Sequence, residues 1–341
     1  MGFQFCDSFD CYDVTASIAK KWSSVGADFA LSTTGGRFGG GCFQNSGGGS
    51  YAAFLTRNVS IVSGATTYVA MWIQITGVTS AGIQQPVIAF NGGSTNNGPL
   101  CLTAAGNLAL IDWNGGVTLA TSTANISDGA YHWIEFALKI NGSSTVAALY
   151  IDGVLQFSGT YSMTQTAQVI TSVYIGPGYN FNSGPNSIDD VIIWDDQGST
   201  FNTFPLGPRR IACLNPSGAG SSTGFTPSTG TNWSCAAQAY AGTKTLISTT
   251  SGQVDTYVTA GLSYSPSSVI NGVVVNSYAQ NPAADGTKNL ISKLQSTTIA
   301  SGATHVPTGT LITYQDCFTT DSTGAAWNTL KVDGMQPGIG D

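Results

Sequence analysis

The sequence predicts an all-β protein built from antiparallel sandwiches. Charged residues make up 9% of the 341 residues, whereas glycine occurs 43 times and hydrophobic residues reach 42%. A single glutamate, Glu135, stands beside seventeen aspartates, although helix surfaces normally draw on Glu and Lys. Short segments in which apolar and polar residues alternate recur between Gly, Asn, Asp and Ser residues, which is the pattern of antiparallel sheets.

Strands are expected throughout the first 200 residues. In the segment from Tyr68 to Ile75, apolar residues occupy both the odd-numbered and the even-numbered positions, which predicts a strand with both faces covered. Between Tyr131 and Ile140, every second residue from Ile134 onward is a large apolar one, which predicts a strand with one core face. Further strands are expected at 86–90, 108–113, 171–175 and 188–194.

A hairpin is the sharpest local prediction. The apolar segments 146–151 and 154–157 are separated only by Asp152-Gly153. A two-residue hairpin turn needs positive φ at both central positions, and Asp-Gly is among the pairs that accept it.

A domain boundary is predicted near residues 199–208, where turn-forming residues and two prolines interrupt the strand pattern. Residues 1–203 hold eleven Asp and one Glu against five Lys or Arg, a net charge of −7. Residues 207–341 hold six Asp against six Lys or Arg, a net charge of zero. We therefore expect one domain at 1–203 and a smaller β-sandwich domain at 207–341.

The second half has a weaker pattern. Residues 216–234 are rich in Gly, Ser and Thr and are expected to form a loop, and residues 324–341 are expected to close the chain with turns. Residues 285–296 fit either a strand or a short helix. Strands are expected at 254–260, 269–279 and 309–314.

Charge and composition exclude several partner classes. A net charge of −7 argues against nucleic acid or an anionic membrane as the main partner. The sequence has no apolar run near the roughly 20 residues that a membrane helix needs, and its start lacks a basic region followed by an apolar signal core. We therefore expect synthesis in a cytoplasm and no membrane insertion.

The seven cysteines are scattered and include no C-x-x-C pair. Their odd number and spacing favour buried thiols over a disulfide framework or a zinc site, with a Cys6–Cys11 bridge as the alternative.

The order of motifs in the first half resembles a known family. The segments ISDGAYHWIEFAL, ALYIDGVLQFSG, VYIGPG and SIDDVIIWDD resemble the laminin-G-like branch of the concanavalin A-like jelly roll. The opening CDSFDCYD…KW, together with GGRFGGGC, is similar to the start of laminin-G-like virion proteins from tailed bacteriophages. The second half, from PLGPRRIACLNPSG to AAWNTLKVDG, is similar to the β-rich domain that follows in those proteins.

This resemblance implies a laminin-G-like jelly roll at 1–203 and a virion-docking β-sandwich at 207–341. It implies a structural component of a tailed-phage virion, in the tail, tail fibre or tail tip, whose partners are other virion proteins and copies of itself. A capsid-surface decoration or head-fibre protein, or a stand-alone glycan-binding lectin, is the alternative. The expected location is the virion, after synthesis in the host bacterial cytoplasm.

Catalysis is not expected. Glycosidases place two carboxylates on either side of the scissile bond, and the jelly-roll glucanases resemble one another in a Glu-x-Asp-x-x-Glu strand, which one glutamate cannot supply. The pairs Asp189-Asp190 and Asp195-Asp196 are adjacent residues, which normally point to opposite faces of a strand.

The two histidines, His132 and His305, do not indicate a hydrolase either. Neither stands near a Gly-x-Ser-x-Gly nucleophile motif, and His132 is expected to be structural. No cofactor and no metal site is predicted, because the sequence has no clustered ligand spacing and no phosphate-binding loop.

Carbohydrate binding without catalysis fits two loops. Sugars bind to an aromatic face and to amide or carboxylate groups that a rigid sandwich positions, and the protein would contact host-cell polysaccharide at such loops. The candidate residues are Asp112, Trp113 and Asn114 in one loop and Tyr179, Asn180 and Phe181 in the other. The alternative is that Trp113 caps the core and that the second of these loops is a surface turn.

Overall fold

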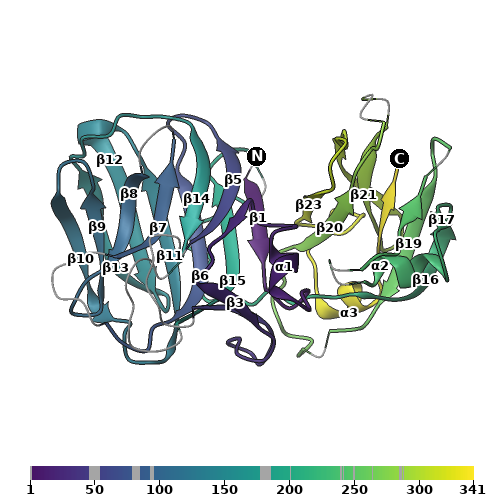
Figure 1. Cartoon of the computed structure of the whole chain (residues 1–341), viewed down its shortest axis with the longest axis horizontal. Coiled ribbons are helices and arrows are strands. Elements are labelled where there is room, and N and C mark those ends of the chain that lie inside the picture. The colour runs from purple at the N-terminus through teal and green to yellow at the C-terminus, as the bar shows by residue number, and fades with distance from the viewer. Residues whose placement is uncertain are drawn as a thin grey trace. The chain divides into compact units, whose positions relative to one another are not determined.

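A computed structural model shows a nearly all-β chain, which confirms the predicted fold class. It describes residues 2–45, 54–78, 85–92, 96–176, 186–199, 201–238, 240, 242–248, 250–262, 264–283, 286 and 288–341. The chain divides into two compact units, Met1–Ile211 and Ala212–Asp341 (Figure 1). We describe each unit by itself.

Two antiparallel sheets form the first unit. The eight-stranded sheet has the order β13 (Val154–Tyr161), β12 (Thr145–Ile151), β11 (Tyr131–Lys139), β6 (Thr67–Gln74), β15 (Asn186–Asp195), β4 (Cys42–Asn45) and β3 (Phe29–Ser32), with β1 (Phe3–Asp7) also paired to β15. The seven-stranded sheet has the order β10 (Val117–Asn125), β9 (Asn107–Asp112), β8 (Asn96–Leu102), β7 (Gln85–Asn91), β14 (Ile170–Ile175), β5 (Leu55–Ile61) and β2 (Ser24–Val25).

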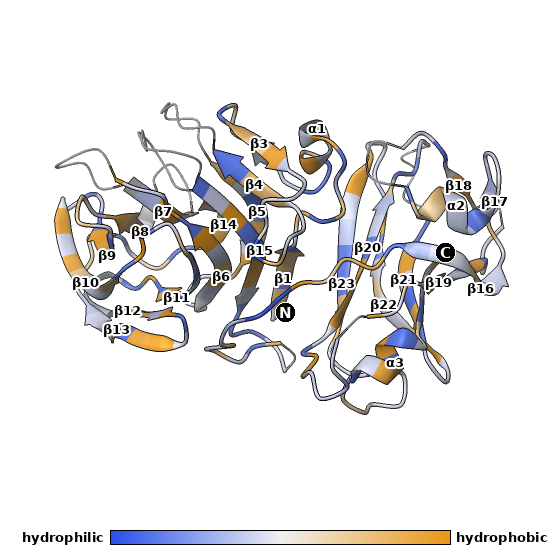
Figure 2. Ribbon diagram, turned by 90° about the horizontal axis from the view of Figure 1, so that it is seen from below, coloured by the Kyte–Doolittle hydropathy of each residue, from blue (hydrophilic) through white to orange (hydrophobic). Residues whose placement is uncertain are grey.

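The two sheets pack face to face around an apolar core. The rings of Phe90 on β7 and Phe136 on β11 stack across the two sheets with centroids 5.9 Å apart. In Figure 2 the strands of this unit, β14 among them, carry strongly hydrophobic segments. The strands predicted at 86–90, 108–113, 171–175 and 188–194 are all present, as β7, β9, β14 and β15.

The predicted hairpin and the predicted doubly covered strand are confirmed. Asp152 and Gly153 join β12 to β13 with φ angles of 52° and 79°, the positive values that a two-residue turn requires. On β6, the residues from Val69 to Ile73 are all buried, so both faces of this strand are covered.

The prediction of one core face for the strand at 131–140 is wrong, because β11 is buried on both faces. Trp133 and Glu135, which alternate with the core residues, are both 0% exposed. The Glu135 carboxylate accepts hydrogen bonds from the backbone N–H groups of Leu206 (2.6 Å) and Gly207 (3.0 Å). A segment that lies more than 70 residues away in the sequence therefore covers the outer face of the strand.

We call residues 204–211 the cover segment. The ring of Phe204 stacks on Tyr68 of β6 with centroids 4.9 Å apart, and the indole N–H of Trp72 donates to the carbonyl of Arg209 at 2.7 Å. Arg209 and Arg210 thus belong to the first unit, which holds twelve acidic and seven basic residues, a net charge of −5. The second unit, which begins after these two arginines, holds six acidic and four basic residues, a net charge of −2.

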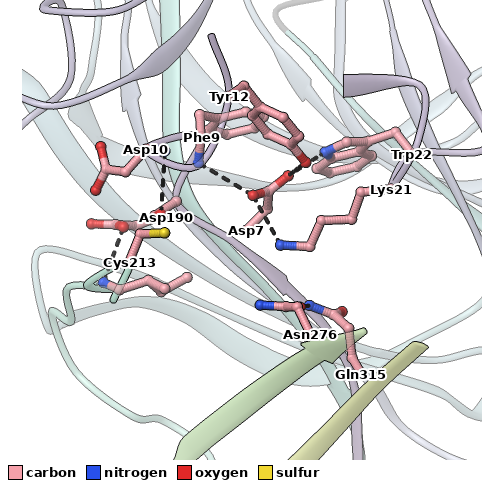
Figure 3. Close-up of polar contacts among 12 residues, drawn as sticks. Asp7, Phe9, Asp10, Tyr12, Lys21, Trp22, Asp190, Cys213, Asn276 and Gln315 are labelled. Carbon is pink, nitrogen blue, oxygen red and sulfur yellow. Dashed lines mark hydrogen bonds and ion pairs between the residues drawn. The ribbon is translucent and has the colours of Figure 1, made fainter. Parts of the chain in front are cut away.

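The N-terminal motif forms one buried polar network (Figure 3). The Asp7 carboxylate accepts hydrogen bonds from the Tyr12 hydroxyl (2.6 Å), the Trp22 indole (2.7 Å) and the Phe9 backbone N–H (3.2 Å), and Lys21 pairs with it at 3.1 Å. These contacts hold the segment that includes α1 (Thr15–Ile18) and ends at Trp22. The residues that carry the family resemblance here therefore have a structural role.

The second unit contains a five-stranded sheet and two smaller pairs of strands. The five-stranded sheet has the order β16 (Pro216–Thr223), β19 (Val254–Thr259), β24 (Gln336–Gly340), β21 (Leu290–Gln295) and β22 (Ile299–His305). The smaller pairs are β17 (Thr226–Pro227) with β18 (Leu246–Ile247), and β20 (Val273–Ala279) with β23 (Ile312–Phe318). Its core includes Val275 on β20 and Leu294 on β21, with Trp327 beside them.

Two expectations for the second unit are wrong. Residues 216–234 form the edge strand β16 and the helix α2 (Asn232–Ala236) in place of a loop, and residues 324–341 form α3 (Thr329–Asp333) and β24 in place of turns. β16 consists of Pro, Ser, Gly, Ala and Thr and is therefore pale in Figure 2. It lies at the edge of the sheet, where one neighbouring strand supplies its backbone hydrogen bonds. The ambiguous segment 285–296 contains a strand, β21.

Five cysteines are thiols, of which Cys6, Cys42, Cys101 and Cys235 are buried. Cys6 is one of these thiols, so the alternative of a Cys6–Cys11 bridge is wrong. None of the helices in the described ranges is long and apolar enough to cross a membrane.

We predict that Glu135→Gln lowers the free energy of unfolding by about 2 kcal/mol. Glutamine replaces one of the two accepting oxygens by an NH2 group, so that one backbone N–H then faces another donor and loses its hydrogen bond. Urea denaturation at neutral pH, followed by tryptophan fluorescence, measures this change. The control is Asp13→Asn, which removes one negative charge from an exposed side chain. Equal stability of the two variants would show that Glu135 does not hold the cover segment.

Candidate functional site

The first candidate loop is the turn between β9 and β10, and Asp112 fixes its conformation. The Asp112 carboxylate accepts hydrogen bonds from the hydroxyl (2.8 Å) and the backbone N–H (2.9 Å) of Thr164, and from the backbone N–H of Gly115 (3.2 Å). Burial by itself would raise the pKa of Asp112, but the hydrogen bonds from Thr164 and Gly115 lower it below the ordinary value. Asp112 is 4% exposed, so its carboxylate faces the protein and not a ligand.

The same turn presents Trp113 to solvent. The Trp113 side chain is 45% exposed, and Asn114 beside it is also exposed. A Cβ atom at Gly115 would lie 2.6 Å from an Asp112 carboxylate oxygen, and Gly116 has a φ of +63°, so both positions require glycine. The turn is thus a tightly built platform with an indole on its outer side, and Trp113 does not cap the core.

The second candidate loop, with Tyr179, Asn180 and Phe181, lies outside the described residues. The structure therefore brings together Asp112, Trp113 and Asn114, and the other three residues remain predictions.

A buried carboxyl cluster lies elsewhere in the first unit, and it contradicts the alternation argument for Asp189-Asp190. The pairing of β15 with β6 shifts between Asp189 and Ile192, and Asp190 has a φ of +49°. The bulge interrupts the regular alternation of side chains, and both carboxyl groups are buried, with Asp189 4% and Asp190 2% exposed. Each carboxylate raises the free-energy cost of ionising the other.

The cluster binds the backbone of two covering segments. Asp189 accepts from the N–H of Arg37 (2.8 Å), and Asp190 accepts from the N–H of Ile211 (3.0 Å). Asp10, which is an exposed residue near this pair, accepts from the N–H of Gly41 at 2.6 Å. Partial desolvation raises the pKa of Asp10, and burial together with neighbouring carboxyl groups raises the pKa of Asp189 and Asp190.

The second aspartate pair is also committed to the fold. Asp195 accepts hydrogen bonds from the Gln4 amide (2.7 Å) and the Gln197 backbone N–H (2.8 Å), and Asp196 accepts from the Thr66 hydroxyl at 2.8 Å. Neither pair of aspartates faces an open surface as two converging carboxylates.

Both histidines have carboxylate partners. His132 contacts Asp152 through Nδ1 (2.7 Å) and Asp128 through Nε2 (3.0 Å), and His305 contacts Asp316 at 3.0 Å. Burial would lower the pKa of His132, but the two carboxylates raise it above the ordinary value. Both ring nitrogens of His132 are thus engaged by carboxylates of the protein itself.

Within the part of the chain that the structure describes, no three His, Cys, Asp or Glu side chains are placed to hold a metal ion.

Residues 46–199 match the concanavalin A-like lectin/glucanases superfamily. The match covers less than half of the chain and lies within the first unit. A comparison with curated protein sequences finds no match.

Solved structures resemble the concanavalin A-like unit only in a general way. The binding domain of Paraclostridial Mosquitocidal Protein 1 is 14% identical at a TM-score of 0.37, with 50% of this chain and 43% of that chain covered. An endo-β-1,4-glucuronan lyase from the fungus Trichoderma reesei is 11% identical at 0.42, with 56% and 95% covered. Domain 4 of the extracellular arabinanase AbnA from Geobacillus stearothermophilus, in complex with arabinotriose, is 16% identical at 0.35, with 56% and 82% covered. Likenesses this distant carry no argument about function.

The carboxyl cluster makes the stability of the concanavalin A-like unit depend on pH. Because the pKa values of Asp189 and Asp190 are raised in the folded state, the native chain binds more protons than the unfolded chain above the ordinary aspartate pKa of 3.8. The stabilisation is fully present below that value and is lost as pH rises through the folded-state values.

We predict that Asp190→Asn reduces this loss between about pH 5 and about pH 9, where one extra bound proton changes stability by up to about 1.4 kcal/mol per pH unit. Asparagine suits this position because it tolerates positive φ. Urea denaturation across this range measures the slope for the variant and the natural chain. Asp13→Asn, at an exposed position, is the control, and identical slopes for Asp190→Asn and the natural chain would contradict the assignment.

Proposed function

We propose that the protein is a non-catalytic carbohydrate-binding protein that holds a glycan on the Trp113 turn. The observation that carries this proposal is a half-exposed indole on a turn that Asp112 fixes from beneath. The C–H face of a sugar ring packs on an aromatic face, and a turn that is already ordered loses little entropy when the sugar binds. Asn114 supplies an amide group next to the indole.

The absence of catalysis is part of the same proposal. Glu135 is occupied by two backbone N–H groups of the cover segment, and His132 is held by two carboxylates. Asp189 and Asp190 have the raised pKa values that an acid catalyst needs, but loop and cover segments bury both of them. A glycosidase needs its two carboxyl groups on either side of an accessible bond.

We further propose that the protein is a structural component of a tailed-bacteriophage virion that is exposed on the particle and contacts host-surface glycans. The support is the sequence resemblance at both ends of the chain and the charge-poor surface. The second unit exposes large apolar side chains, with Val269 82% and Leu330 74% exposed, and has a net charge of only −2. Interfaces that last are poor in charge at their centres, which suits docking on other virion proteins.

Trp113→Ala is expected to weaken glycan binding at least about fivefold, because an aromatic contact contributes about 1 kcal/mol. Affinity electrophoresis in gels that contain dextran, galactan, mannan or polygalacturonate measures binding of the intact chain. Val117→Ala is the matched control, since Val117 is 51% exposed at the end of the same turn but carries no ring. Equal retardation of the two variants would contradict a role for the indole.

The virion proposal predicts that the second unit buries a larger share of its surface against neighbouring chains than the first unit does. A structure of the assembled particle measures both areas. Finding the first unit buried and the second projecting outward would reverse the division of roles. A protein that is absent from purified particles would favour the stand-alone lectin.

A further inference from the structure

The sequence contains five Asn-Gly pairs, and three of them have an exposed asparagine outside the strands. An asparagine before glycine is chemically labile, because the glycine nitrogen can reach the side-chain carbonyl carbon of the asparagine without hindrance from a Cβ atom. The three exposed pairs are alike in sequence and in exposure, so a difference in their lability must come from the backbone around each glycine. They are Asn114-Gly115, Asn141-Gly142 and Asn271-Gly272.

The asparagines of the other two pairs are in different surroundings. Asn91 is half-buried at the end of β7, and its amide donates to the Tyr174 hydroxyl at 3.2 Å. The side chain of Asn97 lies outside the described residues. The three exposed pairs are therefore the ones whose lability can be compared directly.

Two of the three glycine nitrogens are held by hydrogen bonds. The N–H of Gly115 donates to the Asp112 carboxylate at 3.2 Å, and the N–H of Gly142 donates to the Gln165 carbonyl at 2.9 Å. The glycine nitrogen must lose its proton before it attacks, so an acceptor that holds this hydrogen slows the reaction. At Gly115 the acceptor is a carboxylate, whose negative charge also opposes the formation of a second negative charge on the nitrogen.

The third glycine nitrogen is not held in this way. Gly272 follows the exposed Asn271 in the segment that leads into β20, and within the described ranges no residue accepts a hydrogen bond from its N–H. Val269, in the same segment, is 82% exposed, so water reaches the backbone here. Asn271 therefore combines the labile sequence, an exposed side chain and an unrestrained neighbouring nitrogen.

We propose that Asn271 is a site of spontaneous deamidation and that Asp112 protects Asn114 from the same reaction. The Gly272 nitrogen loses its proton to water and attacks the Cγ atom of Asn271, and the Cγ–Nδ2 bond breaks as ammonia leaves with a proton from water. A second water molecule then opens the succinimide ring at either of its carbonyl carbons, which gives aspartate or isoaspartate. Water is the only co-reactant.

The two positions differ in what the reaction would change. Asn114 supplies the amide beside the indole of the proposed glycan site, so its protection preserves that turn as the chain ages. At Asn271 the reaction adds a negative charge to the second unit, and the isoaspartate form also lengthens the backbone directly before β20. A Cβ atom at Gly272 would lie 3.2 Å from the Cys317 sulfur, which leaves little room for a longer backbone. The reaction goes beyond the proposed function and does not depend on it.

Incubation of the intact chain at mildly alkaline pH, followed by chymotryptic digestion and peptide mass spectrometry, tests this inference. We expect Asn271 to deamidate at least about tenfold faster than Asn114, since a hydrogen bond to a charged acceptor must first break at Gly115. The same incubation in urea removes that hydrogen bond and should make the two rates similar.

Variants locate the reaction. Gly272→Ala places a Cβ atom next to the attacking nitrogen and should suppress deamidation at Asn271. Gly218→Ala is the matched control in the same unit, because its Cβ atom would lie in ordinary contact, 3.8 Å from Val258, and it should leave the rate at Asn271 unchanged. Asp112→Ala removes the acceptor and its charge, and should speed deamidation at Asn114 but not at Asn271.

The opposite results would overturn the proposal. Equal rates at Asn271 and Asn114 in the native chain, or an Asn271 rate that Gly272→Ala does not change, would remove the site. A difference that persists in urea would show that the local sequence sets the rates, which removes the protective role of Asp112. An unchanged rate at Asn114 in Asp112→Ala would do the same.

Discussion

The hydrogen bonds from Leu206 and Gly207 to the buried Glu135 carboxylate organise much of the first unit. They hold the cover segment on the outer face of the eight-stranded sheet, which gives β11 two buried faces. The same segment carries Arg209 and Arg210, and its contact with Glu135 brings them to this unit. The placement of these two arginines on the first unit therefore depends on one carboxylate at the middle of a strand.

Buried carboxylates have this role in several places. Asp7 gathers the N-terminal motif, Asp112 fixes the turn that presents Trp113, and Asp189 holds the loop that presents Arg37. In the second unit, Asp255 accepts from the Phe225 backbone N–H at 2.9 Å and from the Asn232 amide at 2.6 Å. Removing a carboxylate from water costs free energy, so several hydrogen-bond donors must offset that cost at each buried carboxylate. Backbone N–H groups of irregular segments supply many of these donors.

This use of acidic residues explains why the loops of a charge-poor protein can be rigid. A loop that is anchored at a buried carboxylate keeps its exposed side chains in one arrangement, which lowers the entropy cost of binding a ligand. It also means that the net charge of the chain is a poor guide to its surface. Aspartates that face inward contribute to the count although they lie away from the surface.

The sequence alone determined the fold class, the hairpin at Asp152-Gly153 and the strand positions of the first unit, because alternation and turn chemistry are local properties. It also placed Trp113 in a candidate site, since an aromatic side chain beside amide and carboxylate groups in a loop can bind a sugar. It could not show that Glu135 faces the cover segment, that a bulge buries Asp189 and Asp190 together, or that 324–341 supplies a central strand. Those features depend on pairs of segments far apart in the chain, and only the tertiary structure brings their donors and acceptors within reach.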